Sequence, residues 1–348
     1  MMLKQYLFRR NAAVRGQAAE KVVRVTAISS VVAVAGLSLG FAPSFSITKD
    51  MGDATARPNP LANARLFVDP ASNARRQADS WRSSRPDQAR ALDIIAQQPQ
   101  AFWINEWAGN PKSAVRSIVT KVGKANALPV LVAYNIPNRD CGSHSAGGAK
   151  DGKAYQRWIR DFAAGLSGRK SVVVLEPDAL AGKCADGERT QLMRDAVQVL
   201  KSAGAAVYID AGNPNWIAAD VMGRRLNEAG IAQADGFALN VSNFYRNAEN
   251  IAYGEKVSRV VGGKHFIIDT SRNGNGSANG AWCNPGGRAL GSAPTAETGH
   301  RLVDAYLWIK RPGESDGRCG GGPNAGKWWG QYALELAQRQ PAALAVNN

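Results

Sequence analysis

The sequence is poor in metal-binding side chains. Only three histidines occur among 348 residues, and no two of the four cysteines form a Cys-x-x-Cys pair. Zinc sites are built from closely spaced cysteine and histidine ligands, so we expect none here. The glycine-rich stretches lack the Gly-Lys-Ser/Thr ending of a phosphate-binding loop, and no nucleotide fingerprint follows the first expected strand. We therefore expect a site without a metal ion or other cofactor.

Acidic residues are outnumbered by basic ones. The chain has 28 Asp and Glu against 43 Lys and Arg, a formal net charge of +15. The basic residues are scattered, and no helix-turn-helix, zinc-finger or RNA-binding signature accompanies them. We expect no nucleic-acid partner and interpret the charge as an aid to solubility and to adhesion on anionic surfaces.

The amino-terminal segment predicts export. Residues 1–24 carry six basic residues and one acid, and an uncharged, mostly apolar stretch follows over residues 25–45. A basic flank before an apolar run is typical of a secretory signal peptide. No clear small-x-small cleavage site ends the run, and its length is close to the ~20 residues that span a bilayer. Residues 1–45 are therefore expected to be a signal peptide or a single membrane anchor, with residues 25–45 as the tether. Either alternative predicts a protein that is secreted or anchored at the cell surface.

The remainder of the chain divides into three parts. Residues 46–60 are polar and proline-bearing and are expected to form a linker. Residues 61–340 are expected to form one large domain, followed by a short tail at residues 341–348, and we expect a monomer. In an exported chain, four cysteines favour two disulfides, for which the sequence alone allows three pairings.

Short apolar runs alternate with helical stretches through the large domain, a pattern typical of a parallel α/β sheet. Two crossover helices are expected at Thr190–Ala203 and Val221–Ala229. A closed or nearly closed barrel is favoured over an open sheet, because no phosphate fingerprint follows the first strand. The expected strands are Ala101–Asn105, Val130–Tyr134, Val172–Glu176, Ala206–Ile209, Gly236–Val241, His265–Ile268 and Ala305–Lys310.

The third expected strand ends in the most informative residues of the chain, Glu176-Pro177-Asp178. Pro177 cannot donate a ladder hydrogen bond and is expected to hold Glu176 extended, so the strand stops there. Asp178 then lies just past the carboxyl end of a strand, where α/β folds place chemistry. A carboxyl held against apolar walls has a raised pKa and can act as a general acid. The alternative is that Asp178 caps the next helix.

Acids follow five of the seven expected strands. In a parallel sheet these acids share one rim, and such a cluster favours a site over five separate turns or caps. Without a Ser, His or Cys constellation, carboxylates are the available catalysts, and paired carboxylates are what glycoside hydrolysis requires. The acids are Asp140, Asp178, Asp210, Asp269, and Glu314 with Asp316.

Tryptophans support a sugar substrate, because flat indoles can stack on pyranose rings. Trp103 and Trp107 follow the first strand, Trp216 follows Asp210, and Trp282 precedes Cys283. Core packing is the alternative for any single tryptophan. We expect it for Trp158 and Trp308, whose neighbours are apolar.

These motifs resemble glycoside hydrolase family six, the cellulase family of β-1,4-glucanases, from about Asn59 to Gln340. The resemblance implies a distorted, incomplete (β/α) barrel of about seven mostly parallel strands, and the pairings Cys141–Cys184 and Cys283–Cys319. It implies inverting hydrolysis of internal β-1,4-glucosidic bonds in cellulose or related β-glucans. The motifs are Tyr134-Asn135-x-Pro137-x-Arg139-Asp140-Cys141, Leu175-Glu176-Pro177-Asp178, Asp210-Ala211-Gly212, and Lys310 through Gly317.

The resemblance also implies a role for each matching residue. Asp178 resembles the general acid, Asp140 the aspartate that modulates it and helps organise the attacking water, and Asp316 the proposed base. Two positions depart: Ala146 stands where many members have a water-holding serine, and Asn213 where some have a histidine. The expected substrate-binding residues are Trp103, Tyr134, Asp210, Trp216, Asn240, Trp282, Lys310 and Glu314.

Two other functions compete with an endoglucanase. A processive cellobiohydrolase would need long loops to roof its cleft, but only Gly317 and Arg318 separate Asp316 from Cys319, and Leu180–Ala185 is short. A non-catalytic, cell-surface glycan-binding protein would not need every principal carboxylate, yet all are present. We therefore expect an open cleft and endo action on a β-1,4-glucan.

Overall fold

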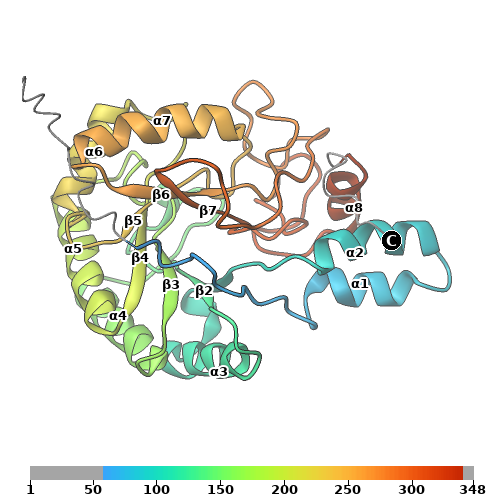
Figure 1. Ribbon diagram of the computed structural model, residues 1–348, viewed down its shortest axis with the longest axis horizontal. Coiled ribbons are helices and arrows are strands. Elements are labelled where there is room, and N and C mark those ends of the chain that lie inside the picture. Colours follow the sequence, from blue (N-terminus) through green and yellow to red (C-terminus); the bar gives the residue numbers. More distant parts are fainter. Residues whose placement is uncertain (1–57, 340–348) are drawn as a thin grey trace, which may run out of the picture. The chain divides into compact units, whose positions relative to one another are not determined.

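The computed structural model describes residues 58–339 (Figure 1). The expected signal peptide or anchor, residues 46–57 of the expected linker and the carboxyl-terminal tail lie outside the described residues. Within residues 58–339, no helix is both long enough and apolar enough to cross a membrane.

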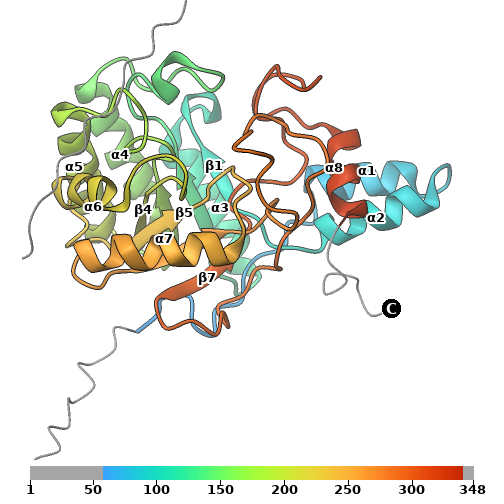
Figure 2. The same cartoon turned by 90° about the horizontal axis from the view of Figure 1, so that it is seen from above.

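Seven parallel strands form one sheet whose spatial order follows the sequence, from β1 to β7. The sheet curls into an incomplete barrel, as predicted (Figures 1 and 2). Among the described residues β1 and β7 are not paired as strands, although Ala101 N donates to Trp308 O (3.0 Å) where the two ends meet. The strands are β1 (Phe102–Ile104), β2 (Val130–Ala133), β3 (Ser171–Leu175), β4 (Ala205–Asp210), β5 (Gly236–Leu239), β6 (His265–Asp269) and β7 (Val303–Leu307).

Both faces of the sheet are buried, which explains why its strands are apolar runs without alternation. In β3, Val172 and Val174 belong to the core cluster inside the barrel, whereas Val173 and Leu175 pack in the cluster that includes the surrounding helices. Val174 is in register with Val132 of β2 and Tyr208 of β4. This burial fixes the register of the central strands and thereby the positions of the residues at their carboxyl ends.

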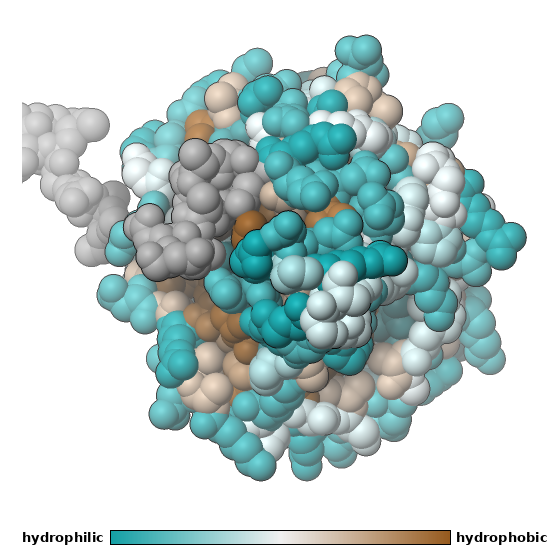
Figure 3. Space-filling view, turned by 90° about the vertical axis from the view of Figure 1, so that its right-hand side faces the viewer, coloured by the Kyte–Doolittle hydropathy of each residue, from teal (hydrophilic) through white to brown (hydrophobic). Residues whose placement is uncertain are grey.

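Within residues 58–339, five helices cover the outside of the sheet, and three others form a separate apolar cluster with Trp308 and Leu290 (Figures 1 and 2). Seen from the side that carries α1 and α2, the surface is mostly hydrophilic, with hydrophobic residues near the middle of the view (Figure 3). The outer five are α3 (Pro111–Lys124), α4 (Gly152–Leu166), α5 (Gly187–Ser202), α6 (Ala219–Glu228) and α7 (Asn247–Val260). The other three are α1 (Asn73–Trp81), α2 (Pro86–Ala96) and α8 (Gly330–Gln338).

The last strand begins two residues and ends three residues earlier than predicted. It was expected at Ala305–Lys310 but spans Val303–Leu307. Its neighbour β6 ends at Asp269, so β6 has no strand residue left to pair with residues 308–310. The Asp269 carboxylate accepts the Lys310 N–H instead (2.9 Å). The Asp269 side chain thus takes the place of the strand-to-strand hydrogen bond at the rim of the barrel and fixes the backbone of Lys310 there.

Candidate active site

A cleft of about 1050 Å³ lies at the carboxyl ends of the strands, lined by the loops that follow them. Most of the predicted site residues meet in it. Its walls include the carboxylates Asp140, Asp178, Glu314 and Asp316, the aromatic residues Trp103, Trp107, Tyr134, Trp216 and Trp282, and Lys310.

The turn after β3 presents Asp178 to the cleft. Glu176 was expected to be extended before Pro177, but its φ of 48° places it in the left-handed region. The buried Glu176 carboxylate accepts the N–H groups of Asn135 (2.9 Å) and Ile136 (3.0 Å), which holds this costly conformation. Asp178 follows with φ 72° and caps no described helix, because α5 is capped by Asp186.

The surroundings of Asp178 favour its protonated form. Its pKa is raised well above the usual value, first by loss of water around the carboxyl and then by the negative charges of Asp210 and Asp140. Lys310 opposes this shift without cancelling it. A carboxyl with a raised pKa keeps its proton to a higher pH and can serve as a general acid.

Asp210 and Asn240 lie beneath the cleft instead of lining it. Asp210 is 1% exposed and accepts the backbone N–H of Asp178 (2.9 Å), and burial raises its pKa to about 7. The buried Asn240 amide donates to Asp269 O (2.8 Å) and accepts the Tyr245 N–H (3.1 Å). In this structure both side chains support the loops that form the cleft wall, and their expected contact with substrate stays a prediction.

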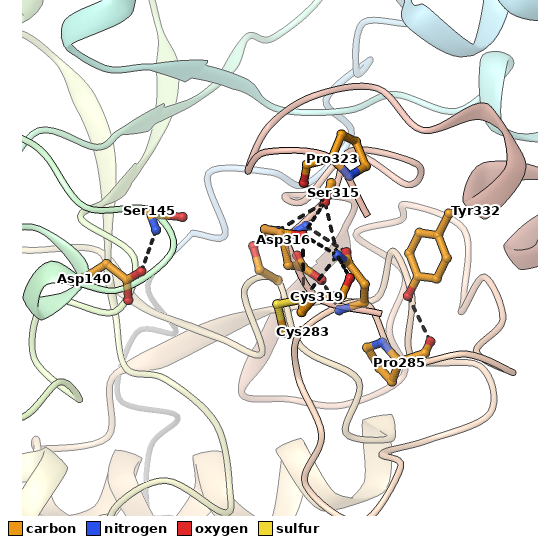
Figure 4. Close-up of a disulfide and its surroundings, with 12 residues drawn as sticks. Asp140, Ser145, Cys283, Pro285, Ser315, Asp316, Cys319, Pro323 and Tyr332 are labelled. Carbon is orange, nitrogen blue, oxygen red and sulfur yellow. Dashed lines mark hydrogen bonds between the residues drawn. A yellow bond between two sulfur atoms is a disulfide. The ribbon is translucent and has the colours of Figure 1, made fainter. Parts of the chain in front are cut away.

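Asp140 lies in the loop after β2, in a short 3-10 helix, η2 (Asp140–Gly142). Its carboxylate accepts the Ser145 N–H (2.7 Å; Figure 4). The disulfide Cys141–Cys184 ties this loop to the segment that follows Asp178. The loop is therefore held next to the general-acid candidate.

Arg139 is the buried support of the same loop. Its guanidinium donates to Tyr134 O and Ser145 O (both 2.8 Å) and lies 4.4 Å from the centroid of the Tyr134 ring. Glu106, in the 3-10 helix η1 (Glu106–Ala108), pairs with it at 2.6 Å. Arg139 belongs to the sequence motif, but nothing in the sequence identified Glu106, which lies 33 residues away.

Asp316 lies on the opposite side of the cleft, beside the disulfide Cys283–Cys319 (Figure 4). Arg272 Nη1 contacts its Oδ2 (2.8 Å) and Lys310 Nζ its Oδ1 (3.3 Å). Burial alone would raise the pKa of Asp316, but the two cations together lower it below the usual value. Asp316 is therefore held ionised. Sequence reasoning missed Arg272, although it closes the Asp269-Thr270-Ser271-Arg272 segment after β6.

The cleft aromatics differ in exposure. Trp103 is fixed by a hydrogen bond from its indole to Ile309 O (2.8 Å) and meets the Tyr134 ring edge-on at 5.1 Å. Trp216 and Trp282 are 41% and 43% exposed, and Trp107 is 67% exposed. Trp158 and Trp308 are buried, as predicted.

The buried carboxyls predict a pH-dependent stability. Burial raises the pKa of Glu176 and of Asp210 to about 7, so between pH 5 and 7 the folded protein binds more protons than the unfolded chain. Stability should therefore fall as pH rises through this window, by at most about 1.4 kcal/mol per pH unit for each group. Asp316, whose pKa is lowered, contributes only at more acidic pH. Urea unfolding at a series of pH values measures the slope.

Glu176→Gln is the matched variant for this measurement. Glutamine keeps the shape of the glutamate side chain but does not titrate. The slope of the unfolding free energy against pH should therefore become shallower by the contribution of one titrating group, even if the variant is less stable overall. Identical slopes for wild type and variant would show that Glu176 is ionised throughout the window.

A carboxyl with a raised pKa and a carboxyl with a lowered pKa line the same cleft, which is edged by exposed indoles. This arrangement defines the class of carbohydrate-hydrolysing enzymes that act through two carboxylates. The chain belongs to glycosyl hydrolases family 6, whose family model matches residues 61–340.

The chain is similar to several members of this family. It is 45% identical over 284 residues to Endoglucanase A of Cellulomonas fimi, covering 80% of this chain and 62% of that one. It is 45% identical over 300 residues to Endoglucanase 1 of Streptomyces halstedii, covering 82% and 90%. Among solved structures it resembles the endoglucanase Cel6 of Mycobacterium tuberculosis in complex with a thio-linked methyl-cellobiosyl cellobioside (TM-score 0.76, 46% identity, 81% and 99% coverage). The chain thus spans about three fifths of the length of the first of these relatives.

Proposed function

We propose that this protein is an inverting endo-β-1,4-glucanase that hydrolyses internal bonds of cellulose or related β-glucans. The observation that carries the proposal is that Asp178 and Asp316 line one cleft in surroundings that shift their pKa values in opposite directions. The similar proteins named endoglucanases, and the solved relative bound to a cellobioside analogue, support the same substrate class.

In this mechanism Asp178 donates its proton to the glycosidic oxygen as the bond to the anomeric carbon breaks. A water attacks that carbon from the opposite face of the sugar, and its proton passes to Asp316, directly or through further water. A carboxylate with a lowered pKa is a weak base, so Asp316 acts on a water already polarised by the developing positive charge. Asp140 adds to the burial and the Asp210 charge that raise the pKa of Asp178, and it helps to organise the water.

The remaining cleft residues bind the glucan. Tyr134 lies beneath the distorted sugar, and the indoles of Trp103, Trp216 and Trp282 stack on neighbouring rings. Lys310 and Glu314 provide polar contacts from the loop after β7, where Arg311 Nη1 holds the Glu314 carboxylate at 3.3 Å. Asp210 supports Asp178 from below, and Asn240 supports the Tyr245 loop.

Inversion has a direct stereochemical readout. An inverting site leaves room for a water, with its carboxyls about 6.5–9.5 Å apart, against about 5–5.5 Å for a retaining site. We expect Asp178 and Asp316 to fall in the wider range when substrate is bound. Proton NMR of a fresh cellopentaose digest should then show α-anomeric product first. Initial β-anomer would refute inversion.

Endo action should appear as a rapid loss of viscosity. Only two residues separate Asp316 from Cys319, so this loop is too short to build a long roof. On carboxymethylcellulose, viscosity should collapse while few reducing ends have been released, because internal cuts halve long chains. A viscosity drop that lags far behind reducing-sugar release would favour a processive cellobiohydrolase instead.

We also propose that the chain is exported, either secreted or anchored at the cell surface through residues 25–45, and that it acts as a monomer. The two disulfides support an oxidising compartment. In this proposal residues 1–45 are the signal peptide or anchor, residues 46–60 the linker, residues 61–340 the catalytic domain and residues 341–348 a tail.

A further inference from the structure

Glu106 joins the loops that follow the first two strands. It lies in η1, after β1, and its carboxylate binds both terminal nitrogens of Arg139, in the loop after β2. Oε2 accepts from Nη1 (2.6 Å) and Oε1 from Nη2 (3.0 Å), and Oε1 also accepts the Gly148 N–H (3.3 Å). A two-pronged contact of this kind fixes the plane of the guanidinium as well as its position.

The loop after β2 closes tightly onto this carboxylate. A Cβ added at Gly147, whose φ is 139°, would collide with Glu106 Oε1. A Cβ added at Gly148, whose φ is 96°, would collide with Ile136 O. Two consecutive glycines therefore permit an approach and a backbone conformation that other residues would disfavour. The loop is thus shaped to receive the Glu106 side chain.

Arg139 passes this contact on to the residues of the cleft. Its buried guanidinium also donates to Tyr134 O and Ser145 O (both 2.8 Å) and lies 4.4 Å from the centroid of the Tyr134 ring. Ser145 in turn donates its N–H to the Asp140 carboxylate (2.7 Å; Figure 4). A chain of direct contacts therefore runs from Glu106 to Tyr134 and to Asp140.

Glu106 is the counter-charge of Arg139. The other acceptors that Arg139 reaches within residues 58–339 are backbone carbonyls. A buried cation that loses its counter-charge is strongly disfavoured. Without Glu106, the guanidinium would shift toward water or toward the neighbouring Asp140, and Tyr134 and the Ser145 backbone would shift with it. Glu106 itself does not line the cleft, so it cannot act by touching substrate there.

We propose that Glu106 is a positioning residue for hydrolysis, which acts through Arg139 on Tyr134 and Asp140. This inference rests on the proposed glucanase function, in which Tyr134 lies beneath the distorted sugar and Asp140 helps to organise the attacking water. Both of these tasks concern the attack on the sugar ring, whatever leaving group the ring carries. Loss of Glu106 therefore slows hydrolysis whether or not the leaving group needs a proton.

The test is Glu106→Gln, which keeps the size of the side chain but removes the counter-charge. We expect kcat to fall by about ten- to a hundredfold with KM within about threefold of wild type. The fall should be the same on soluble β-glucan and on 2,4-dinitrophenyl β-cellobioside, whose leaving group departs without a proton. Glu106→Asp keeps the charge and should show a smaller loss of the same pattern, and it carries the test if Glu106→Gln does not fold.

Asp93→Asn is the matched control. The Asp93 carboxylate lies in α2, outside the cleft lining, and accepts from Arg75 (2.6 Å) and Arg82 (2.9 Å). Its loss breaks a comparable ion pair, so the melting temperature should fall while kcat is unchanged. The double variant Glu106→Gln/Asp140→Asn should lose less than the product of the two single losses, because both changes disturb the same water.

Four outcomes would overturn the inference. They are an unchanged kcat in Glu106→Gln, a loss confined to β-glucan, an equal loss of kcat in Asp93→Asn, and a double variant whose loss equals the product. The second would place Glu106 behind the proton donor instead, and the third would reduce its effect to general destabilisation. Failure of the proposed function is distinguishable, because the wild type would then hydrolyse neither substrate.

Discussion

Asp178→Ala is expected to lower kcat on soluble β-glucan by about 10²–10⁴-fold, the usual contribution of a general acid. The glucoside oxygen is a poor leaving group unless it is protonated as the bond breaks, and Asp178 is the cleft carboxyl whose pKa is raised well above its usual value. The loss should be much smaller on 2,4-dinitrophenyl β-cellobioside, whose leaving group departs without a proton. Steady-state kinetics on both substrates measures the difference.

Asp186→Ala is the matched control, since it removes an aspartate that caps α5 and lies outside the cleft lining. It should cost about 1 kcal/mol of stability, as cap losses do, and leave kcat unchanged. Asp178→Ala should show the reverse pattern, with lost activity and a preserved melting curve. Equal, background-level sugar release by wild type and Asp178→Ala would instead favour a non-catalytic glycan-binding protein.

The position of Asp178 could be predicted because its determinants are local. Four apolar residues followed by Glu176-Pro177-Asp178 fix where the strand ends, and a parallel sheet directs all such ends to one rim. The same argument located the strands to within a few residues and gathered the acids after them. Sequence patterns of this kind report burial and chain direction, which do not depend on partners elsewhere in the chain.

The conformation of Glu176 could not be predicted, because tertiary contacts override the local preference. The residue before proline favours an extended backbone, but two N–H groups from a loop 41 and 40 residues away attract the Glu176 carboxylate and turn the backbone left-handed. Arg272 could not be predicted as a site residue for a similar reason, since its partner Asp316 is 44 residues away in the sequence. Residues that change the conformation or the pKa of distant site residues leave no regular spacing in the sequence by which they could be recognised.

Asp140→Asn should move the alkaline limb of the kcat/KM–pH profile to lower pH. Ionised Asp140 disfavours a second negative charge on Asp178 and so raises the pKa of the acid, and a neutral asparagine removes that repulsion. Asp178 then loses its catalytic proton at a lower pH. Turnover should also fall by about ten- to a hundredfold, because the attacking water loses a residue that positions it.

Asp210→Asn provides the comparison that ranks the causes of the raised pKa of Asp178. Loss of water around Asp178 is the largest cause, and neither variant changes it. In neither variant should the alkaline limb of the pH profile therefore fall to the pH expected for a free aspartate. The Asp210 charge contributes more than that of Asp140, and an asparagine oxygen can still accept the Asp178 N–H, so Asp210→Asn should shift the limb farther. Asp151→Asn, at the exposed start of α4, should not shift the alkaline limb.

Melting curves on the same samples test for unfolding, which we do not expect, since Cys141 keeps its disulfide. An unmoved limb and normal turnover in Asp140→Asn would make Asp140 a structural turn residue, leaving burial and Asp210 to keep the acid protonated.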